Sequence, residues 1–296
     1  MISILIPTYN YNIIKLVTNL HGQCTEQPID YEILVLDDCS SNKEIKIQNR
    51  TINNLDKCRY IESKENKGRT ASRDHLAKEA TYNWLLFLDA DVMPKYKDFI
   101  SRFIENLNKA QLIFGGINYA ETKPDIDLML RWKYGHSRES LTVLQRDKTP
   151  FLSINSGCFL IEKELFISVN KHLAFNTYGL DNLFKQLLET KEVRVLHIDN
   201  PVYHLGLEKN TIFIKKSLES VETTVLLEEK GLIQPDLRPI QKTYLKGKKY
   251  RMLPLFRKII TLFEKQMISN FNSKNPSLFL FDLYRLYYYD KLKRNA

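Results

Sequence analysis

Trp84-Leu85-Leu86-Phe87-Leu88-Asp89-Ala90-Asp91 joins five apolar residues to two carboxylates one residue apart. Side chains of an extended chain alternate between its faces, so Asp89 and Asp91 are expected to project to the same side. Carboxylates this close repel each other unless a cation lies between them, and a hard divalent ion suits oxygen ligands. Such an ion usually completes its coordination with substrate phosphates and water. The segment therefore predicts a metal site and a phosphate-bearing substrate; the alternative is a solvated turn or a helix N-cap.

Apolar runs alternate with amphipathic segments on both sides of this segment. Strands are expected at residues 2–6, 33–36, 59–61, 84–88, 112–117 and 193–198, and helices at 13–21, 43–54, 69–80 and 96–109. This alternation indicates an α/β fold, with a mainly parallel sheet flanked by helices. Ligands of such sheets bind at the carboxyl ends of the strands. The residues after the first, second and fourth strands are therefore expected to converge on one crevice.

The pattern changes towards the C-terminus. Residues 121–150 fit neither period and are expected to form a mobile loop with a short helix, whereas only helices are expected after Leu207. The chain is therefore expected to divide at this point, into residues 1–207 and a C-terminal helical extension, residues 208–296.

Charge is distributed unevenly along the 296 residues, whose net charge is +9. From Arg238 onward there are 14 Lys and Arg against three acidic residues, whereas the preceding 237 residues hold 30 basic and 32 acidic groups. Such a basic tail suits an anionic membrane, nucleic acid or an acidic polymer, or is simply a solvated helical face. Nucleic acid is the least favoured partner, because no motif supports it.

The tail also contains apolar residues at helical spacing: Leu255, Phe256, Ile259, Ile260, Leu262, Phe263, Met267 and Phe271. Such a stripe more often packs on its own domain, and the alternative is reversible docking on a membrane. The four scattered cysteines argue against a disulfide framework and a thiolate zinc site. With no signal-like N-terminus and no long apolar window, a cytoplasmic location is expected, with peripheral contact at the inner face of the cytoplasmic membrane.

Four motifs in order resemble the family 2 glycosyltransferases with the GT-A fold. They are Ile4-Leu5-Ile6-Pro7-Thr8-Tyr9-Asn10, Leu36-Asp37-Asp38-Cys39-Ser40, Asn66-Lys67-Gly68-Arg69-Thr70-Ala71-Ser72-Arg73-Asp74 and Leu88-Asp89-Ala90-Asp91. The resemblance covers roughly residues 1–207 and not the tail. It implies a Rossmann-like GT-A sheet and an inverting, metal-dependent transfer of sugar from a UDP-sugar to a hydroxyl of a saccharide or lipid-linked acceptor, in cell-surface polysaccharide or glycoconjugate synthesis.

The resemblance also implies roles for residues around the nucleotide. Pro7, Thr8 and Tyr9 resemble the loop that contacts the base, the alternative being a proline-initiated turn. Asp38 matches the carboxylate that accepts a hydrogen bond from the uracil imide, the alternative being a helix N-cap. Gly68 and Arg73 are expected to border the nucleotide and diphosphate, although Arg73 could instead form a surface ion pair.

The chemical step is assigned in the same way. Asp89 and Asp91 resemble the pair that holds Mn²⁺ or Mg²⁺, and Asp89 is also expected to border the nucleotide. His204 matches a histidine that often completes the metal shell; the alternative is a structural histidine. Asp181 stands where the family carries its base, although Leu180 replaces the usual acidic neighbour, and its alternative role is to stabilise a helix dipole.

A last segment and two rival functions complete the expectations. Asn155, Ser156 and Gly157 resemble the lining of the donor and acceptor pocket. One rival is a catalytically silent relative that binds nucleotide or membrane as an assembly partner. The other is a sugar-phosphate nucleotidyltransferase, which is disfavoured because residues 7–12 contain no glycine.

Overall fold

The computed structural model describes residues 1–173 and 177–295, which form two compact units. The first comprises residues 1–120, 139–176 and 187–206; the second comprises residues 121–138, 177–186 and 207–296. The second unit therefore includes two segments that precede Leu207 in the sequence. The division into residues 1–207 and 208–296 remains a prediction about domains.

The first unit is built on a mostly parallel sheet in the order β3-β2-β1-β4-β8-β6-β9. Its parallel half consists of β3 (Cys58–Glu62), β2 (Tyr31–Asp37), β1 (Ile2–Thr8) and β4 (Trp84–Leu88). All residues of β1 and β4 are buried, as expected for central strands covered on both faces. Leu5 of β1 pairs with Leu34 on one side and Phe87 on the other, so the expected parallel core is confirmed.

The other half of the sheet contains an antiparallel strand that the sequence pattern did not predict. β8 (Cys158–Glu162) pairs antiparallel with β4 and with β6 (Leu112–Phe114), and β9 (Val195–His197) runs parallel to β6. Pairing with β4 places the start of β8 beside Leu88, the residue before the acidic pair.

A second, three-stranded sheet has the order β5-β10-β7, with β5 (Val92–Pro94), β10 (Val202–His204) and β7 (Ile117–Asn118). The expected strand 112–117 was therefore correct only as far as Phe114, because the chain leaves one sheet there and enters the other at Ile117. Gly115 and Gly116 allow this change: a Cβ on Gly115 would lie 2.3 Å from the Asn200 carbonyl oxygen, and Gly116 has a φ of +105°.

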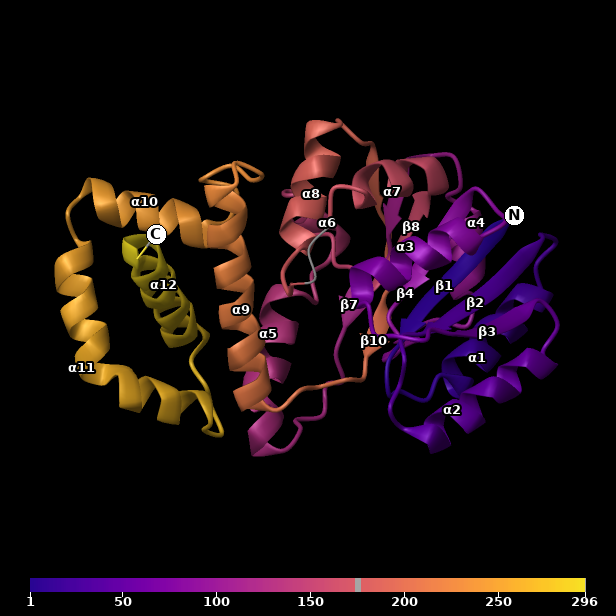
Figure 1. The fold of residues 1–296 in the computed structure, drawn as a ribbon, viewed down its shortest axis with the longest axis horizontal. Helices are drawn as coiled ribbons and strands as arrows, with labels where there is room; N and C mark the ends of the chain where they lie inside the picture. The colour runs from indigo at the N-terminus through magenta and orange to yellow at the C-terminus, as the bar shows by residue number, and fades with distance from the viewer. Residues whose placement is uncertain (174–176, 296) are drawn as a thin grey trace. The chain divides into compact units, whose positions relative to one another are not determined.

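Helices pack on both sides of the large sheet. α1 (Ile14–Thr25) and α2 (Lys43–Asn49) lie on one side in Figure 1 and α3 (Arg69–Glu79) on the other, as right-handed crossovers require. The unit also contains α4 (Phe99–Ile104), α6 (Val143–Arg146) and α7 (Lys163–Asn170). Two expected helices were too long: residues 43–54 divide into α2 and a 3₁₀ helix, η1 (Arg50–Asn54), and residues 96–109 are helical only in α4.

The second unit is helical. It contains η2 (Ile126–Leu128), α5 (Met129–Arg138), the first part of α8 (Asp181–Thr190), α9 (Asn210–Glu229), α10 (Pro239–Lys249), α11 (Leu253–Phe271) and α12 (Leu278–Asn295). α12 lies among α9, α10 and α11 and packs on all three (Figure 1). Phe213 and Phe271 both pack against Phe281 in one core cluster, the Phe271 ring meeting it edge to face.

The helices after Leu207 confirm the expected C-terminal helical region. Within residues 121–150, most of the structure is helical, and α5 packs on α9 through Tyr134 and Phe213, whose ring centroids are 5.2 Å apart. No helix in the described ranges is both long and apolar enough to span a lipid bilayer.

Candidate active site at the carboxyl ends of the strands

Asp89 and Asp91 directly follow β4 and are fixed through their backbone. The Asp89 N–H donates to the Gly157 carbonyl oxygen at 3.1 Å, and the Asp91 carbonyl oxygen accepts from Leu205 N–H at 2.8 Å. The charge of Asp89 also raises the pKa of Asp91, after the larger effect of burial, so the two carboxylates act on each other. The adjacent acidic pair expected from the sequence is therefore present at the carboxyl end of the sheet.

Asp89 is bound by two arginines at the N-terminus of α3. Arg73 Nη2 lies 2.7 Å from Asp89 Oδ1, and Arg69 Nη1 lies 3.4 Å from Oδ2. Arg73 also donates to the Ser156 carbonyl oxygen at 2.5 Å, and its guanidinium lies over the rings of Phe87 and Phe159. Because Arg73 is only 7% exposed, its ion pair is not the surface pair considered as its alternative role.

Asp91 lies beside His204, the last residue of β10 in the small sheet. Pairing of β10 with β5 sets His204 opposite Val92, and His204 Nε2 lies 3.5 Å from Asp91 Oδ2. Burial raises the pKa of the Asp91 carboxyl, and the nearby His204 opposes that rise. Burial and then the charge of Asp91 raise the pKa of Tyr11, in the loop after β1. The acidic pair and the exit loop of the first strand therefore belong to the same site.

The residues around Asp91 fit a divalent cation. His204 Nε2 lies beside Asp91 Oδ2, so an imidazole nitrogen and a carboxylate oxygen, both common metal ligands, are next to each other. Within the described ranges, no group of three or more His, Cys, Asp and Glu side chains is arranged to hold a metal ion. One or two protein ligands are nevertheless the usual protein share of a magnesium site that substrate phosphates complete.

Asp38 organises the loop before α3. Its Oδ1 accepts from Lys67 N–H and its Oδ2 from Gly68 N–H, both at 2.8 Å, while Asn66 Nδ2 donates to its carbonyl oxygen. Gly68 has a φ of +82°, which favours glycine. The N-cap of α2 is Asn42, not Asp38, so that alternative role is wrong. Asp38 lines a cavity of about 300 Å³ with Leu36, Ile61, Glu62, Ser63, Lys64, Glu65, Lys67, Ala71, Ser72 and His75.

The loop after β1 lies beside Asp38. Pro7 pairs with Leu36 inside the sheet, and the Thr8 carbonyl oxygen accepts from Asp38 N–H at 2.9 Å. Thr8 is buried, whereas Tyr9 is 51% exposed, so its ring is accessible to a ligand.

Asn155, Ser156 and Gly157 lie next to Asp89. Asn155 Oδ1 accepts from Gly157 N–H at 2.8 Å. A Cβ on Gly157 would lie 3.1 Å from Ile117 Cδ1 and 3.2 Å from Asn155 Oδ1, with Asp89 Oδ2 in ordinary contact at 3.5 Å, so even alanine would press on Ile117 and Asn155. The first unit thus brings together the predicted residues from Pro7 to Gly157, and His204.

Asp181 is the first residue of α8 and belongs to the second unit. The preceding turn requires glycine, because Gly179 has a φ of +102° and a Cβ there would lie 2.7 Å from Ser220 Oγ. A carboxylate in the first helical turn suits both a base and a partner of the helix dipole. Its catalytic role therefore stays a prediction.

Three further residues belong to the site and were not singled out from the sequence. Arg69 contacts Asp89. Burial and then the charge of Asp91 raise the pKa of Tyr11. Gly206 approaches Asp91 so closely that a Cβ would overlap its carboxylate. Arg69 lies within the motif around Gly68, and Gly206 follows His204 by two residues, but only the folded structure shows which carboxylate each one meets.

The site can be compared with known proteins. The sequence model described as "Glycosyl transferase family 2" matches residues 3–169. An uncharacterised glycosyltransferase of Haemophilus influenzae is 28% identical over 135 residues, which cover 42% of this chain and 44% of that relative. The matched region thus spans less than half the length of this curated relative.

Solved structures share the fold. A mannosyltransferase from Pyrobaculum calidifontis, in complex with GDP-Man and Mn²⁺, has a TM-score of 0.58 at 15% identity, over 98% of this chain and 86% of its own. Glucosyl-3-phosphoglycerate synthase from Mycobacterium tuberculosis, in complex with Mg²⁺ and UDP, has a TM-score of 0.50 at 14% identity, over 79% of this chain and 80% of its own. With the family match covering more than half of its length, this chain belongs to glycosyl transferase family 2.

Proposed function

We propose that this member of glycosyl transferase family 2 is a metal-dependent, inverting glycosyltransferase, and that it transfers a sugar from a UDP-sugar to a hydroxyl group of a saccharide or lipid-linked acceptor. The observation that supports this best is the pairing of Asp91 with His204 beside Asp89, at the carboxyl end of β4. Cell-surface polysaccharide or glycoconjugate synthesis is the proposed setting, since acceptors of this class are made there.

UDP is the proposed nucleotide. Asp38 presents a buried carboxylate whose oxygens each have a remaining lone pair for an imide N–H. The structurally similar synthase of Mycobacterium tuberculosis was solved with UDP and Mg²⁺, and the mannosyltransferase with GDP-Man and Mn²⁺. A donor panel that includes GDP-mannose therefore tests the proposed choice of base.

Asp91 and His204 are the proposed ligands of Mn²⁺ or Mg²⁺, with Asp89 beside them. When bound, the ion would stabilise the negative charge that develops on the departing diphosphate. Both oxygens of Asp89 already face guanidinium groups, so Arg69 and Arg73 orient this carboxylate and keep positive charge next to the diphosphate site.

Asp181 is the proposed general base. A carboxylate at this position would take the proton from the acceptor hydroxyl as its oxygen attacks the anomeric carbon. The bond from the anomeric carbon to the diphosphate breaks in the same displacement, so the sugar configuration inverts. Gly179 sets the start of α8, and with it the backbone of Asp181.

We further propose peripheral attachment to an anionic membrane through α11, at the cytoplasmic side. Of its apolar stripe, Ile260, Met267 and Phe271 are buried in the second unit, whereas Leu255, Ile259, Leu262 and Phe263 are exposed. Lys258 and Lys265 are exposed on the same helix. Four more exposed cations precede it, Lys246, Lys248, Lys249 and Arg251, and together the six complement an anionic surface.

Release of UDP from a panel of UDP-sugars, with Mn²⁺ or Mg²⁺ present, tests the proposed reaction. A metal-dependent product signal with one of these donors is the expected result. If UDP raises the melting temperature of the protein but no UDP is released from any donor, the protein would instead be a catalytically silent relative that binds nucleotide.

A further inference from the structure

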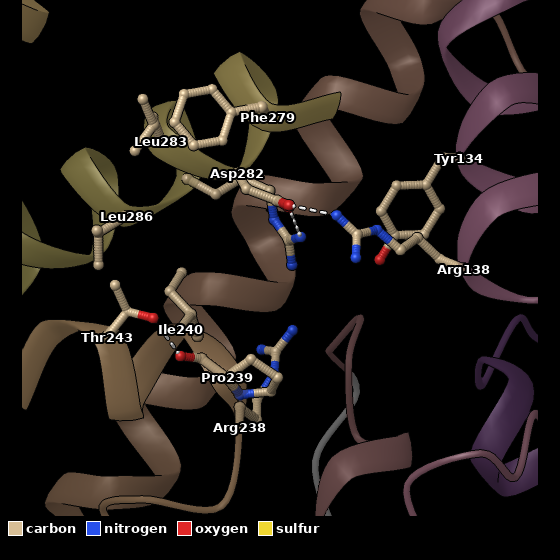
Figure 2. A pocket seen from close by; sticks show the side chains of 11 residues that line it. Tyr134, Arg138, Arg238, Pro239, Ile240, Thr243, Phe279, Asp282, Leu283 and Leu286 are labelled. Atoms are coloured by element: carbon tan, nitrogen blue, oxygen red, sulfur yellow. Dashed lines mark hydrogen bonds and ion pairs between the residues drawn. The ribbon is translucent and has the colours of Figure 1, made fainter. Parts of the chain in front are cut away.

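A cavity of about 370 Å³ lies within the second unit, and none of its lining residues has been assigned a role above. Residues of α5 and α12, together with the N-terminal turn of α10, line it (Figure 2). Three of the lining residues are arginines, Arg138, Arg238 and Arg285, and one is acidic, Asp282. The cavity is therefore rich in positive charge.

The single lining carboxylate is shared between two of these arginines. Asp282 Oδ2 lies 2.8 Å from Arg138 Nη2, and its Oδ1 lies 3.6 Å from Arg285 Nη1. Figure 2 shows the Arg138 guanidinium directed across the cavity at Asp282. Arg285 is only 12% exposed, and its Nε is buried without a hydrogen-bond partner among the described residues. A buried N–H of this kind usually has an acceptor, so an acceptor from a ligand would complete the site.

Arg238 bonds to neutral groups instead of a carboxylate. Its Nη1 donates to the Ser220 carbonyl oxygen at 3.2 Å and to the Thr224 hydroxyl. Burial lowers the pKa of Arg238, and the next largest effect is the neighbouring Arg285, which outweighs the opposing charge of Glu228. Glu228 is itself bound by the Tyr289 hydroxyl and by Lys293. Arg238 and Arg285 are thus two partly desolvated cations that repel each other, and the only carboxylate lining the cavity, Asp282, is shared between Arg285 and Arg138.

Apart from Tyr134 and Thr243, the remaining walls are apolar. Ile240, Leu283 and Leu286 face the cavity with Pro239 and Phe279 (Figure 2). The volume lies at the lower end of the range for small-molecule sites, which are mainly apolar with a few convergent polar groups. Guanidinium groups match the geometry of phosphate oxygens and bind them through paired hydrogen bonds.

We propose that this cavity binds a phosphate monoester that bears an apolar substituent. The phosphate lies against Arg138, Arg238 and Arg285, and the substituent lies against Ile240, Leu283 and Leu286. The inference concerns binding alone and does not depend on the proposed glycosyl transfer.

Calorimetric titration of the full chain with hexyl phosphate tests this site. UDP and Mg²⁺ are kept saturating, so that any phosphate site near Asp91 is already occupied. Binding of one hexyl phosphate is expected, at least tenfold tighter than inorganic phosphate because burial of two methylenes is already enough for that gain. Arg138→Gln and Arg285→Gln are each expected to weaken it about tenfold, as loss of a charged hydrogen bond does.

Two further variants give opposite and null results. Asp282→Asn removes the competing carboxylate and is expected to tighten binding at least threefold, whereas a merely structural role of Asp282 would weaken it. Arg294→Gln, on the same helix but paired with Asp290, makes the same change in net charge and is expected to leave binding within twofold. Arg138 is 51% exposed, so its variant is expected to fold even if Arg285→Gln does not.

A short-chain lipid distinguishes the sources of the phosphate. Dihexanoyl phosphatidic acid that binds at least as tightly as hexyl phosphate, and loses affinity in Arg138→Gln, identifies a lipid headgroup; weaker binding than hexyl phosphate identifies a smaller soluble ester. The proposal is overturned if wild type binds neither ester, or if Arg138→Gln and Arg285→Gln bind hexyl phosphate as wild type does.

Discussion

Gly206 approaches Asp91 so closely that a Cβ on Gly206 would lie 1.9 Å from Asp91 Oδ2. The Asp91 carboxylate can turn away, so Gly206→Ala is expected to fold with a stability loss of about 1 kcal/mol or less. Turnover is expected to fall at least tenfold, because the displaced carboxylate no longer faces His204. Gly22→Ala is the control: nothing lies within 4 Å of its Cβ position, and alanine stabilises a helix interior by about 0.5–1 kcal/mol. Equal turnover in the two variants would contradict this assignment of Gly206.

Asp181→Asn is expected to lower kcat by about 10² to 10⁴, the usual contribution of a general base. The affinity for UDP is expected to stay within about twofold, since the variant keeps the shape of the side chain and does not touch the nucleotide. Glu189→Gln, an exposed change near the other end of α8, is the control and is expected to leave kcat unchanged. Undiminished turnover in Asp181→Asn would remove this residue from the mechanism.

His197 is expected to make stability depend on pH. It is buried against Phe114, and burial, followed by the charge of Arg146, lowers its pKa from 6.5, whereas the Pro150 carbonyl oxygen and Asp147 oppose the shift. Between that lowered pKa and 6.5, the unfolded chain binds more protons at this site than the folded protein. Stability from this group is therefore full above pH 6.5 and falls as pH decreases, with a slope approaching about 1.4 kcal/mol per pH unit.

His197→Gln isolates this contribution, because glutamine can still donate to the Pro150 carbonyl oxygen. Urea unfolding at several pH values between 5 and 8, with the free energies of wild type and variant subtracted, is the measurement. The difference is expected to shrink as pH falls below about 6.5. A difference that is constant across this range would show that His197 binds protons equally in both states.

Attachment through α11 is expected to depend on its exposed apolar face. Leu262→Glu and Phe263→Glu, at side chains 72% and 49% exposed, are each expected to reduce co-sedimentation with vesicles containing phosphatidylserine at least fivefold. The same change at Leu144, which is 79% exposed in the first unit, adds an equal charge elsewhere and is expected to have little effect. Equal losses in all three variants would indicate a general charge effect instead of docking through this helix.

The sheet core was predictable because β1, β2 and β4 are buried on both faces and so appear as continuous apolar runs. β8 was missed, since its partners β4 and β6 are distant in sequence and its five residues have no distinctive period. The three-residue strands β5 and β10 are too short for periodicity to reveal, yet their pairing is what sets His204 beside Asp91.

The acidic pair was predictable for a similar reason, because both carboxylates follow a strand directly. Their partners were harder to predict. Arg73 was expected to border the diphosphate, but its bond to Asp89 depends on how α3 packs on β1 and β2, which the sequence pattern does not show. Gly206 required the folded structure for the same reason, since its constraint is a distance to Asp91.

The most direct test of the account is metal-dependent release of UDP from its donor by wild type, Asp91→Asn and Asp89→Asn. Wild type is expected to lose activity on chelation and to regain it with Mn²⁺ or Mg²⁺. Asp91→Asn is expected to need at least tenfold more metal than wild type for half-maximal rate. Asp89→Asn is expected to raise the metal requirement by a smaller factor, because Asp89 is held by Arg73. Chelator-resistant turnover, or an unchanged metal requirement in Asp91→Asn, would contradict the proposed site.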